Sequence, residues 1–311
     1  MLFRGMLCAL ALGAAVACAD DIDGADDAVL HDEAQALKPT SPFAYPAPLW
    51  AFKDNSLQRK VDEAISDLGL GKYARRKRLS VALVDVTNVD RPRVAEINGD
   101  VMMYAASLPK IAILLTAFEQ IAQGKLKLDP RLELMLEAMI RRSSNSASTE
   151  VMHRVGTPNI AKVLRDPRYR LYDPKHNGGL WVGKDYGKEG LWQRDPLHNI
   201  SHGATALQTA RFYYLLQTGQ LVTPEYSRKM KEILAETAIE HKFVKALREV
   251  SPDAVMCRKS GSWRNFHSDS ALVERDGKSY IAVVLSEDDD GAEWLGRIIV
   301  ALDRIIAGES S

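Results

Sequence analysis

The stretch Tyr104-Ala-Ala-Ser107-Leu-Pro-Lys110-Ile-Ala-Ile-Leu-Leu-Thr-Ala-Phe-Glu119 organises the rest of the chain. Its apolar residues recur at helical spacing directly after a serine, which places Ser107 at the mouth of a buried helix. Residues three apart on a helix share a face, with Cβ atoms about 5 to 6 Å apart, so the Ser107 hydroxyl and the Lys110 amine can meet away from bulk water. A serine before a helix is also commonly a simple cap, and Pro109 fits an ordinary helix start.

Outside this stretch, strand signals lie towards both ends of the chain and helical signals lie between them. The β-rich runs are residues 79–86 and 93–97 near the start, and 254–259, 268–274 and 279–286 near the end. The last two runs are joined by Asp276-Gly277, a strong hairpin signal. Amphipathic helices are expected at 57–68 and 294–306, with the further helices between residues 107 and 250. One of these is expected at 224–234, with Thr223 as its cap and Pro224 at its first position.

This order predicts an α+β fold, in which an antiparallel sheet built from both ends of the chain is flanked by terminal helices and carries an inserted all-helical lobe. With 311 residues, of which 46% are hydrophobic, the chain can bury a substantial core. We expect one catalytic domain over residues 50–308. Its sheet lobe is expected at about 50–106 and 251–308 and its helical lobe at about 107–250, with a ligand in the cleft between them.

The N-terminus has the pattern of an export signal. Residues 1–19 contain Arg4, a short apolar run and small residues before Asp20, which predicts a signal peptide and a periplasmic or extracellular protein. Cys18 also fits, imperfectly, a lipoprotein cleavage site, so a lipid anchor there is an alternative. Residues 20–49 are acidic and then Pro-rich, typical of a disordered leader. If residues 1–19 are removed, Cys257 is the only cysteine, so no intramolecular disulfide is expected.

Two further motifs follow Ser107 in an informative order. Ser143-Ser144-Asn145 lies between two expected helices, and Lys259-Ser260-Gly261 ends the first late strand, where a glycine allows close approach to the backbone. Each motif alone is weak. In this order, Ser-x-x-Lys, Ser-x-Asn and Lys-Ser-Gly resemble the penicillin-recognising serine hydrolases, which comprise the class A β-lactamases and the penicillin-binding proteins. The resemblance covers about residues 50 to 308.

The resemblance implies a role for each matching residue. Ser107 is the expected nucleophile, Lys110 the base that takes its proton, and Ser143 the relay to the leaving nitrogen, with Lys259 as the nearby cation. The backbone N–H groups of Ser107 and Ser262 are the expected oxyanion donors. The expected substrate contacts are a carboxylate held by Lys259, Ser260 and Ser262 beside Gly261, the acylamide side chain at Asn145, and a contribution from Arg264.

The chain departs from the family pattern in three places. Ser144 replaces the usual aspartate of the second motif, and only 36 positions separate Ser107 from Ser143, which implies a trimmed helical lobe. No Glu-x-x-Leu-Asn occurs, and the segment where it belongs is rich in glycine and aromatic residues. Asp195 matches the spacing with a shorter acid and is the expected catalytic carboxylate, and Glu189 is another candidate.

The sequence gives little sign of a metal, a cofactor or a nucleic-acid partner. His198 and His202 are four residues apart but lack a third ligand at helical spacing, so no metal or other cofactor is expected. No basic run with interleaved aromatics indicates nucleic acid. We expect a monomeric exported serine hydrolase that acts on a β-lactam or a cell-wall peptide. The alternatives are a D-alanyl-D-alanine carboxypeptidase of the penicillin-binding type and a sensor that is acylated without turnover.

Overall fold

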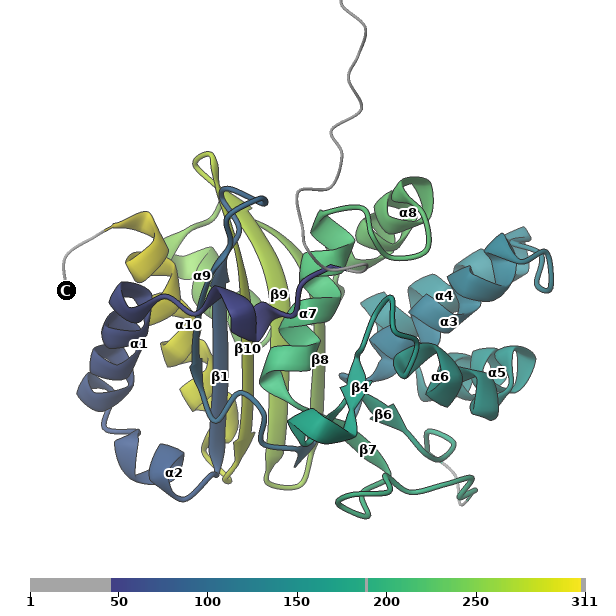
Figure 1. Ribbon diagram of the computed structural model, residues 1–311, viewed down its shortest axis with the longest axis horizontal. Coiled ribbons are helices and arrows are strands. Elements are labelled where there is room, and N and C mark those ends of the chain that lie inside the picture. Colours follow the sequence, from purple (N-terminus) through teal and green to yellow (C-terminus); the bar gives the residue numbers. More distant parts are fainter. Residues whose placement is uncertain (1–45, 188–189, 309–311) are drawn as a thin grey trace, which may run out of the picture. The chain divides into compact units, whose positions relative to one another are not determined.

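The computed structural model describes residues 46–187 and 190–308 (Figure 1). The expected signal peptide with Cys18, the leader up to residue 45 and the candidate base Glu189 lie outside the described residues. Within the described part, no helix is both long enough and apolar enough to cross a membrane.

Strands from the two ends of the chain pair in one five-stranded antiparallel sheet, which confirms the predicted α+β class. The strand order is β2-β1-β10-β9-β8, and the bounds are Arg93–Ile97 for β2, Leu79–Asp85 for β1, Lys278–Glu287 for β10, Phe266–Arg275 for β9 and Val255–Trp263 for β8. Asp276 and Gly277 both have positive φ in the β9–β10 turn, as the hairpin signal predicts. The strand β8 continues to Trp263, beyond its expected end at Lys259. A second two-residue turn, Arg264-Asn265, then joins β8 to β9.

Helices from both termini cover one face of this sheet. Alternate residues of β1, such as Val81 and Leu83, share a buried cluster with α1 (Asn55–Asp67) and α10 (Gly291–Ala307). The flanking terminal helices are therefore confirmed. The short helix α2 (Gly71–Arg75) leads into β1, and α9 (Phe243–Val250) packs against α10 (Figure 1). The helical lobe was expected to extend to residue 250. The helix α9 lies within that range, but its apolar face is part of the buried core of the sheet lobe.

The opposite face carries the remaining helices. Alternate residues Ala82 and Val84 of β1 belong to a second buried cluster, and α7 (Ala206–Gln217) packs directly on β1, β9 and β10. Beyond it lie α3 (Lys110–Ala122), α4 (Pro130–Arg141), α5 (Asn145–Val155), α6 (Thr157–Leu164) and α8 (Pro224–Ala235). Residues 110–119 of α3 are all buried, so α3 is the central helix of this part. Thr223 caps α8 and Pro224 occupies its first position, as expected.

The inserted part is not purely helical, which corrects the expected all-helical lobe. A three-stranded sheet contains β3 (Met103–Tyr104), β7 (His202–Ala204) and β6 (Trp181–Val182), and a two-stranded sheet contains β4 (Tyr172–Asp173) and β5 (Gly178–Gly179). Short 3-10 helices lie at Leu49–Phe52 and Pro174–His176. The glycines of this segment explain the irregular backbone: Gly178 and Gly179 both have positive φ, which side chains other than glycine rarely adopt.

The packed chain begins before the expected boundary at residue 50. Leu49 is fully buried, and the buried Arg211 of α7 donates hydrogen bonds to the carbonyl oxygens of Pro46 (3.0 Å) and Ala47 (2.8 Å). The same guanidinium donates to the carbonyl oxygen of Tyr169. Arg211 thus satisfies its buried donors with backbone oxygens and fixes the entering chain against α7.

Candidate active site

Ser107 lies in a turn between β3 and α3. Its carbonyl oxygen accepts a hydrogen bond from the Lys110 backbone N–H at 3.3 Å, and Ala106 before it has φ of 50°. The α-helix begins at Lys110 and has no side-chain cap, so the Ser107 hydroxyl makes no capping hydrogen bond. Among the described residues, this half-buried hydroxyl has no hydrogen-bond partner, which leaves it available for chemistry.

The amine of Lys110 binds the second motif. Its Nζ donates to the Ser143 carbonyl oxygen (2.6 Å), to Asn145 Oδ1 (2.9 Å) and, at 3.4 Å, to Ser143 Oγ. Ser143 is held with φ of 53°, a left-handed conformation that aims both of its oxygens at the amine. No hydrogen bond joins Lys110 Nζ to Ser107 Oγ in the described structure, so the proton transfer between these two side chains stays a prediction.

Ser144 has a structural task that accounts for its place in the motif. Its Oγ accepts a hydrogen bond from the Ala147 backbone N–H at 3.2 Å and so caps α5. Aspartate and serine are both good caps, because each offers a side-chain oxygen to the first free N–H groups of a helix. The replacement of the usual aspartate therefore leaves the local structure supported.

Lys259 reaches the same serine from β8. Its Nζ donates to Ser143 Oγ (2.9 Å) and to the Ser260 carbonyl oxygen (2.7 Å). Ser143 Oγ thus lies between two buried amines. The structure brings together Lys110, Ser143 and Lys259, which the sequence placed in three separate motifs.

The two amines have strongly perturbed acidity. Burial lowers the pKa of Lys110 to about 7. Burial, and then repulsion from Lys110 and Arg258, lowers the pKa of Lys259 well below its ordinary value. Two ammonium groups that share one hydroxyl in a water-poor site oppose each other's protonation. A lysine can act as a general base near neutral pH only if its amine can accept a proton there.

Gly261 allows β8 to run against Ser107. A Cβ on Gly261 would overlap the carbonyl oxygen of Ala105 and would lie 2.7 Å from the backbone nitrogen of Ser107. Only glycine fits this position without moving the strand. Ser260 is buried next to it, and Ser262 is exposed one residue further along β8. The third predicted motif therefore borders Ser107 along a strand edge.

Arg264 lies at the tip of the β8–β9 hairpin, with φ of 52°. Its guanidinium lies 4.3 Å from the centroid of the Trp263 ring, a cation–π contact. Trp263 also contacts Tyr104 of β3, with ring centroids 5.1 Å apart. Arg264 is exposed, and its predicted part in substrate binding stays a prediction.

Asp195 is buried and engaged in its own loop. Its carboxylate accepts hydrogen bonds from the Tyr172 hydroxyl and from the backbone N–H groups of Leu197 and His198. These contacts explain why an acid stands at this place, because they close the turn at residues 195–199 and tie it to β4. No hydrogen bond joins Asp195 to Ser107 or Lys110 in the described part, and its proposed role as a base stays a prediction.

The sequence did not indicate that Tyr186 and His202 belong to the surroundings of Lys110. Tyr186 places its ring 4.6 Å from Lys110 Nζ, and His202 stacks on Tyr186 with centroids 4.2 Å apart and planes 5° from parallel. The Tyr186 hydroxyl and both His202 ring nitrogens are buried without a hydrogen-bond partner among the described residues. Only the high aromatic content of residues 166–202 hinted at such a contact.

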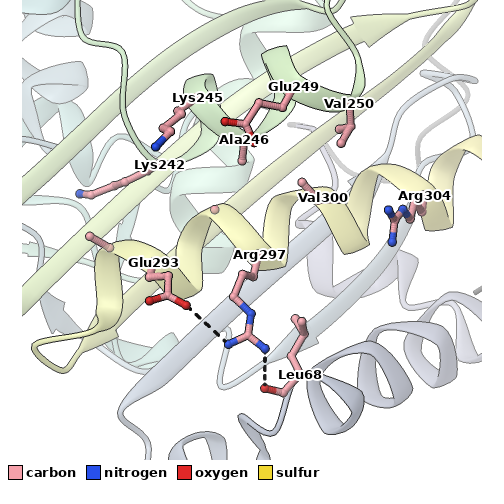
Figure 2. A pocket seen from close by; sticks show the side chains of 12 residues that line it. Leu68, Lys242, Lys245, Ala246, Glu249, Val250, Glu293, Arg297, Val300 and Arg304 are labelled. Carbon is pink, nitrogen blue, oxygen red and sulfur yellow. Dashed lines mark hydrogen bonds and ion pairs between the residues drawn. The ribbon is translucent and has the colours of Figure 1, made fainter.

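The described residues hold no cluster of three or more His, Cys, Asp or Glu side chains suited to a metal ion. The two histidines that invited a metal interpretation have separate contacts, since a ring nitrogen of His198 lies 3.1 Å from the carbonyl oxygen of Asn177 while His202 stacks on Tyr186. A groove of about 450 Å³ lies elsewhere, between α9 and α10 (Figure 2). None of the predicted site residues lines it.

Solved structures of known proteins share the fold of this chain. PBP-A superposes with a TM-score of 0.61 and 16% identity over 85% of this chain and 99% of its own. A β-lactamase from Sphaerobacter thermophilus gives 0.62 and 15% over 81% and 99%, and a class A β-lactamase from Bacteroides cellulosilyticus gives 0.62 and 15% over 82% and 98%. A search of curated protein sequences finds no significant match.

The structural likenesses establish a β-lactamase and transpeptidase type of fold. The sequence itself matches the family described as the Beta-lactamase enzyme family over residues 60–306, which spans the sheet, the central helix and all three motifs. The chain belongs to the Beta-lactamase enzyme family.

Proposed function

We propose that this protein is an exported serine hydrolase. β-Lactams or related amides acylate Ser107, and water then hydrolyses the acyl-enzyme. The observation that carries the proposal is the shared hydrogen-bond system of Lys110, Ser143 and Lys259 beside an unengaged serine hydroxyl. A variant of PBP-A, which has the same fold, forms an acyl-enzyme complex with penicillin G. Export rests on the signal pattern of residues 1–19.

Acylation starts when neutral Lys110 takes the proton of Ser107. Because burial lowers the pKa of Lys110 to about 7, about half of the molecules carry the neutral amine at that pH. A neutral amine has two N–H groups and one lone pair, so one of its three contacts must open or reverse. The weakest is the 3.4 Å contact with Ser143 Oγ. Its loss costs least, and it frees the lone pair for the Ser107 proton.

Ser143 then links the amine to the leaving group. Its hydroxyl accepts from Lys259 and lies within reach of Lys110, so it can give its proton to the leaving nitrogen while Lys110 returns one to it. The negative oxygen that forms on the attacked carbonyl is assigned to the backbone N–H groups of Ser107 and Ser262. One such donor is typically worth about 2.7 to 4 kcal/mol of transition-state stabilisation.

Intact-mass spectrometry with penicillin G tests the nucleophile. We expect a mass increase of one acyl group in the wild-type protein and none in Ser107→Ala. Ser66→Ala, an exposed serine change on α1, is the matched control and should label like wild type. A persistent adduct in Ser107→Ala would remove Ser107 as the nucleophile.

Time courses distinguish the proposed hydrolase from its two rivals. An adduct that decays with release of opened penicillin supports a β-lactamase. A D-alanyl-D-alanine carboxypeptidase would keep the penicillin adduct and release alanine from a D-alanyl-D-alanine peptide, whereas a sensor would keep the adduct and leave the peptide intact. The substrate preference of the chain follows directly from the three outcomes.

A further inference from the structure

Lys242 is a buried lysine that contacts the third motif from the start of α9. It directly precedes α9 and has φ of 54°. Its Nζ donates to the carbonyl oxygens of Gly261 (2.7 Å) and Ser268 (3.1 Å) and to Ser262 Oγ (2.8 Å). These three acceptors use all three hydrogens of an ammonium group. Figure 2 shows Lys242 at one end of the groove between α9 and α10, directed away from Arg297 and Arg304.

The contact with Ser262 determines where that hydroxyl can send its proton. A hydroxyl has one hydrogen to donate, and here its oxygen already accepts from Lys242. Ser262 Oγ has no second partner within the described structure, and Ser262 is exposed on β8, one residue beyond Gly261. Its hydrogen is therefore free to point outward at the strand edge that borders Ser107.

The local charge favours an anion at this edge. Arg258 binds both oxygens of Asp269, at 2.8 and 2.7 Å, so the carboxylate is already paired. Lys242, which is mostly an ammonium at pH 7, then adds positive charge that no other buried acid beside β8 balances within the described residues. A negative group that approaches Ser262 meets both a free hydroxyl hydrogen and this positive field.

We infer that Lys242 is a positioning residue that orients the Ser262 hydroxyl to donate to the carboxylate of the substrate. This inference rests on the proposed function, because it assigns a new residue to the carboxylate end of that site. When Lys242 is an ammonium, it donates to Ser262 and the hydroxyl turns outward. When Lys242 is neutral, its lone pair can accept the Ser262 proton and the outward donor is lost.

The state of Lys242 changes within a measurable range of pH. Burial lowers its pKa to about 8, with Asp269 opposing and Arg258 reinforcing that shift. Carboxylate recognition should therefore be complete below about pH 7 and should weaken as pH rises through 8. The charged and titratable groups around it, from the packed strands, the preceding loop and the two helices of the groove, are Arg258, Lys259, His267, Asp269, His241, Lys245, Glu249, Glu293, Arg297 and Arg304.

Equilibrium binding separates this inference from the chemistry. The Ser107→Ala protein is titrated by calorimetry with penicillin G and with its methyl ester, which lacks the negative charge. We expect the acid to bind roughly tenfold more tightly than the ester at pH 7, as for a hydrogen bond to a charged group. Adding Ser262→Ala or Lys242→Met should remove most of this preference, and both changes together should remove no more than either alone.

Lys245→Met is the matched control, because Lys245 is an exposed lysine that lines the same groove. It should keep the full preference. Raising the pH to 9.5 should shrink the preference, and the part of this pH effect that belongs to Lys242 should disappear in Ser262→Ala. Ser262 is exposed, so this arm keeps the test valid even where Lys242→Met does not fold.

Other outcomes overturn the inference. A purely structural Lys242 would make Lys242→Met weaken both probes equally and leave their ratio unchanged. Additive effects of Lys242→Met and Ser262→Ala, or no preference for the acid at pH 7, would do the same. Failure of the proposed function appears separately, as the absence of a covalent adduct on the wild-type protein.

Discussion

Lys110 should make the fold less stable at neutral pH, and replacing it should reveal the cost. Burial lowers its pKa from 10.5 to about 7, a shift of about 3.5 units that corresponds to about 5 kcal/mol of unfavourable free energy below pH 7. In Lys110→Met this cost disappears, while the lost hydrogen bonds to Ser143 and Asn145 offset about 2 to 3 kcal/mol. The variant should therefore be about 2 kcal/mol more stable than wild type at pH 6.

The sign of the pH dependence follows from the direction of the shift. The folded-state pKa lies below the unfolded one, so between pH 7 and 10.5 the unfolded chain binds the proton more readily and the stability of wild type rises with pH. The advantage of Lys110→Met should accordingly fall by about 3 kcal/mol between pH 6 and 9.5, so that the variant is about 1 kcal/mol less stable than wild type at pH 9.5. Acylation by wild type should rise over the lower part of this range, because it needs the neutral amine.

Urea unfolding of wild type, Lys110→Met and the exposed-lysine control Lys60→Met at pH 6, 8 and 9.5 measures these differences. Groups common to all three proteins cancel in the comparison. We expect Lys60→Met to track wild type at every pH. A Lys110→Met advantage that stays constant from pH 6 to 9.5 would refute the lowered pKa, and with it the reason to regard Lys110 as a neutral-pH base.

The remaining predictions concern the strand beside Ser107 and the second half of the reaction. Gly261→Ala should slow acylation at least about tenfold and cost about 1 to 3 kcal/mol of stability, because its Cβ meets backbone atoms, whereas Gly71→Ala has only a flexible arginine nearby; equal melting temperatures and rates would contradict this. Penicillin G hydrolysis should show a burst followed by slow turnover, since the chain lacks Glu-x-x-Leu-Asn; fast hydrolysis without a burst would remove that premise. If Asp195 is the base, stopped-flow traces of Asp195→Asn should keep the burst and lose the slow phase, together with some stability from its three turn contacts; an unchanged slow phase would place the base elsewhere.

The sequence predicts this architecture well where its patterns are periodic. The hairpin at Asp276-Gly277 and the helix opened by Thr223 and Pro224 appear as expected, because their signals act over a few neighbouring residues. The β8–β9 turn gives no such signal, since Arg264 adopts positive φ without being glycine or asparagine. The helix α9 lies within the range expected to be helical, but its packing in the sheet lobe was not predicted, because α9 is only eight residues long and its apolar face is buried mainly by α10.

The candidate site was predicted as motifs, but not as a set of contacts. Spacing alone suggested that Lys110 would meet Ser107, whereas the amine binds Ser143 and Asn145 in the described structure. Tyr186 could not be foreseen, because an aromatic residue in an irregular loop carries no periodic signal for what it will touch. Tertiary packing decides such contacts, and a single sequence holds no record of it.

The pairing of β1 with β10 has a consequence for the order in which the chain can fold. Leu79 of β1 pairs with Ser286 of β10, so an interior strand made early in synthesis waits for a partner made near the end. Until then β1 has an open edge and apolar residues such as Val81 and Leu83 without their cover, an arrangement that invites contact with other chains. Contacts this far apart in sequence also slow folding. The sheet therefore closes only after almost the whole chain has left the ribosome.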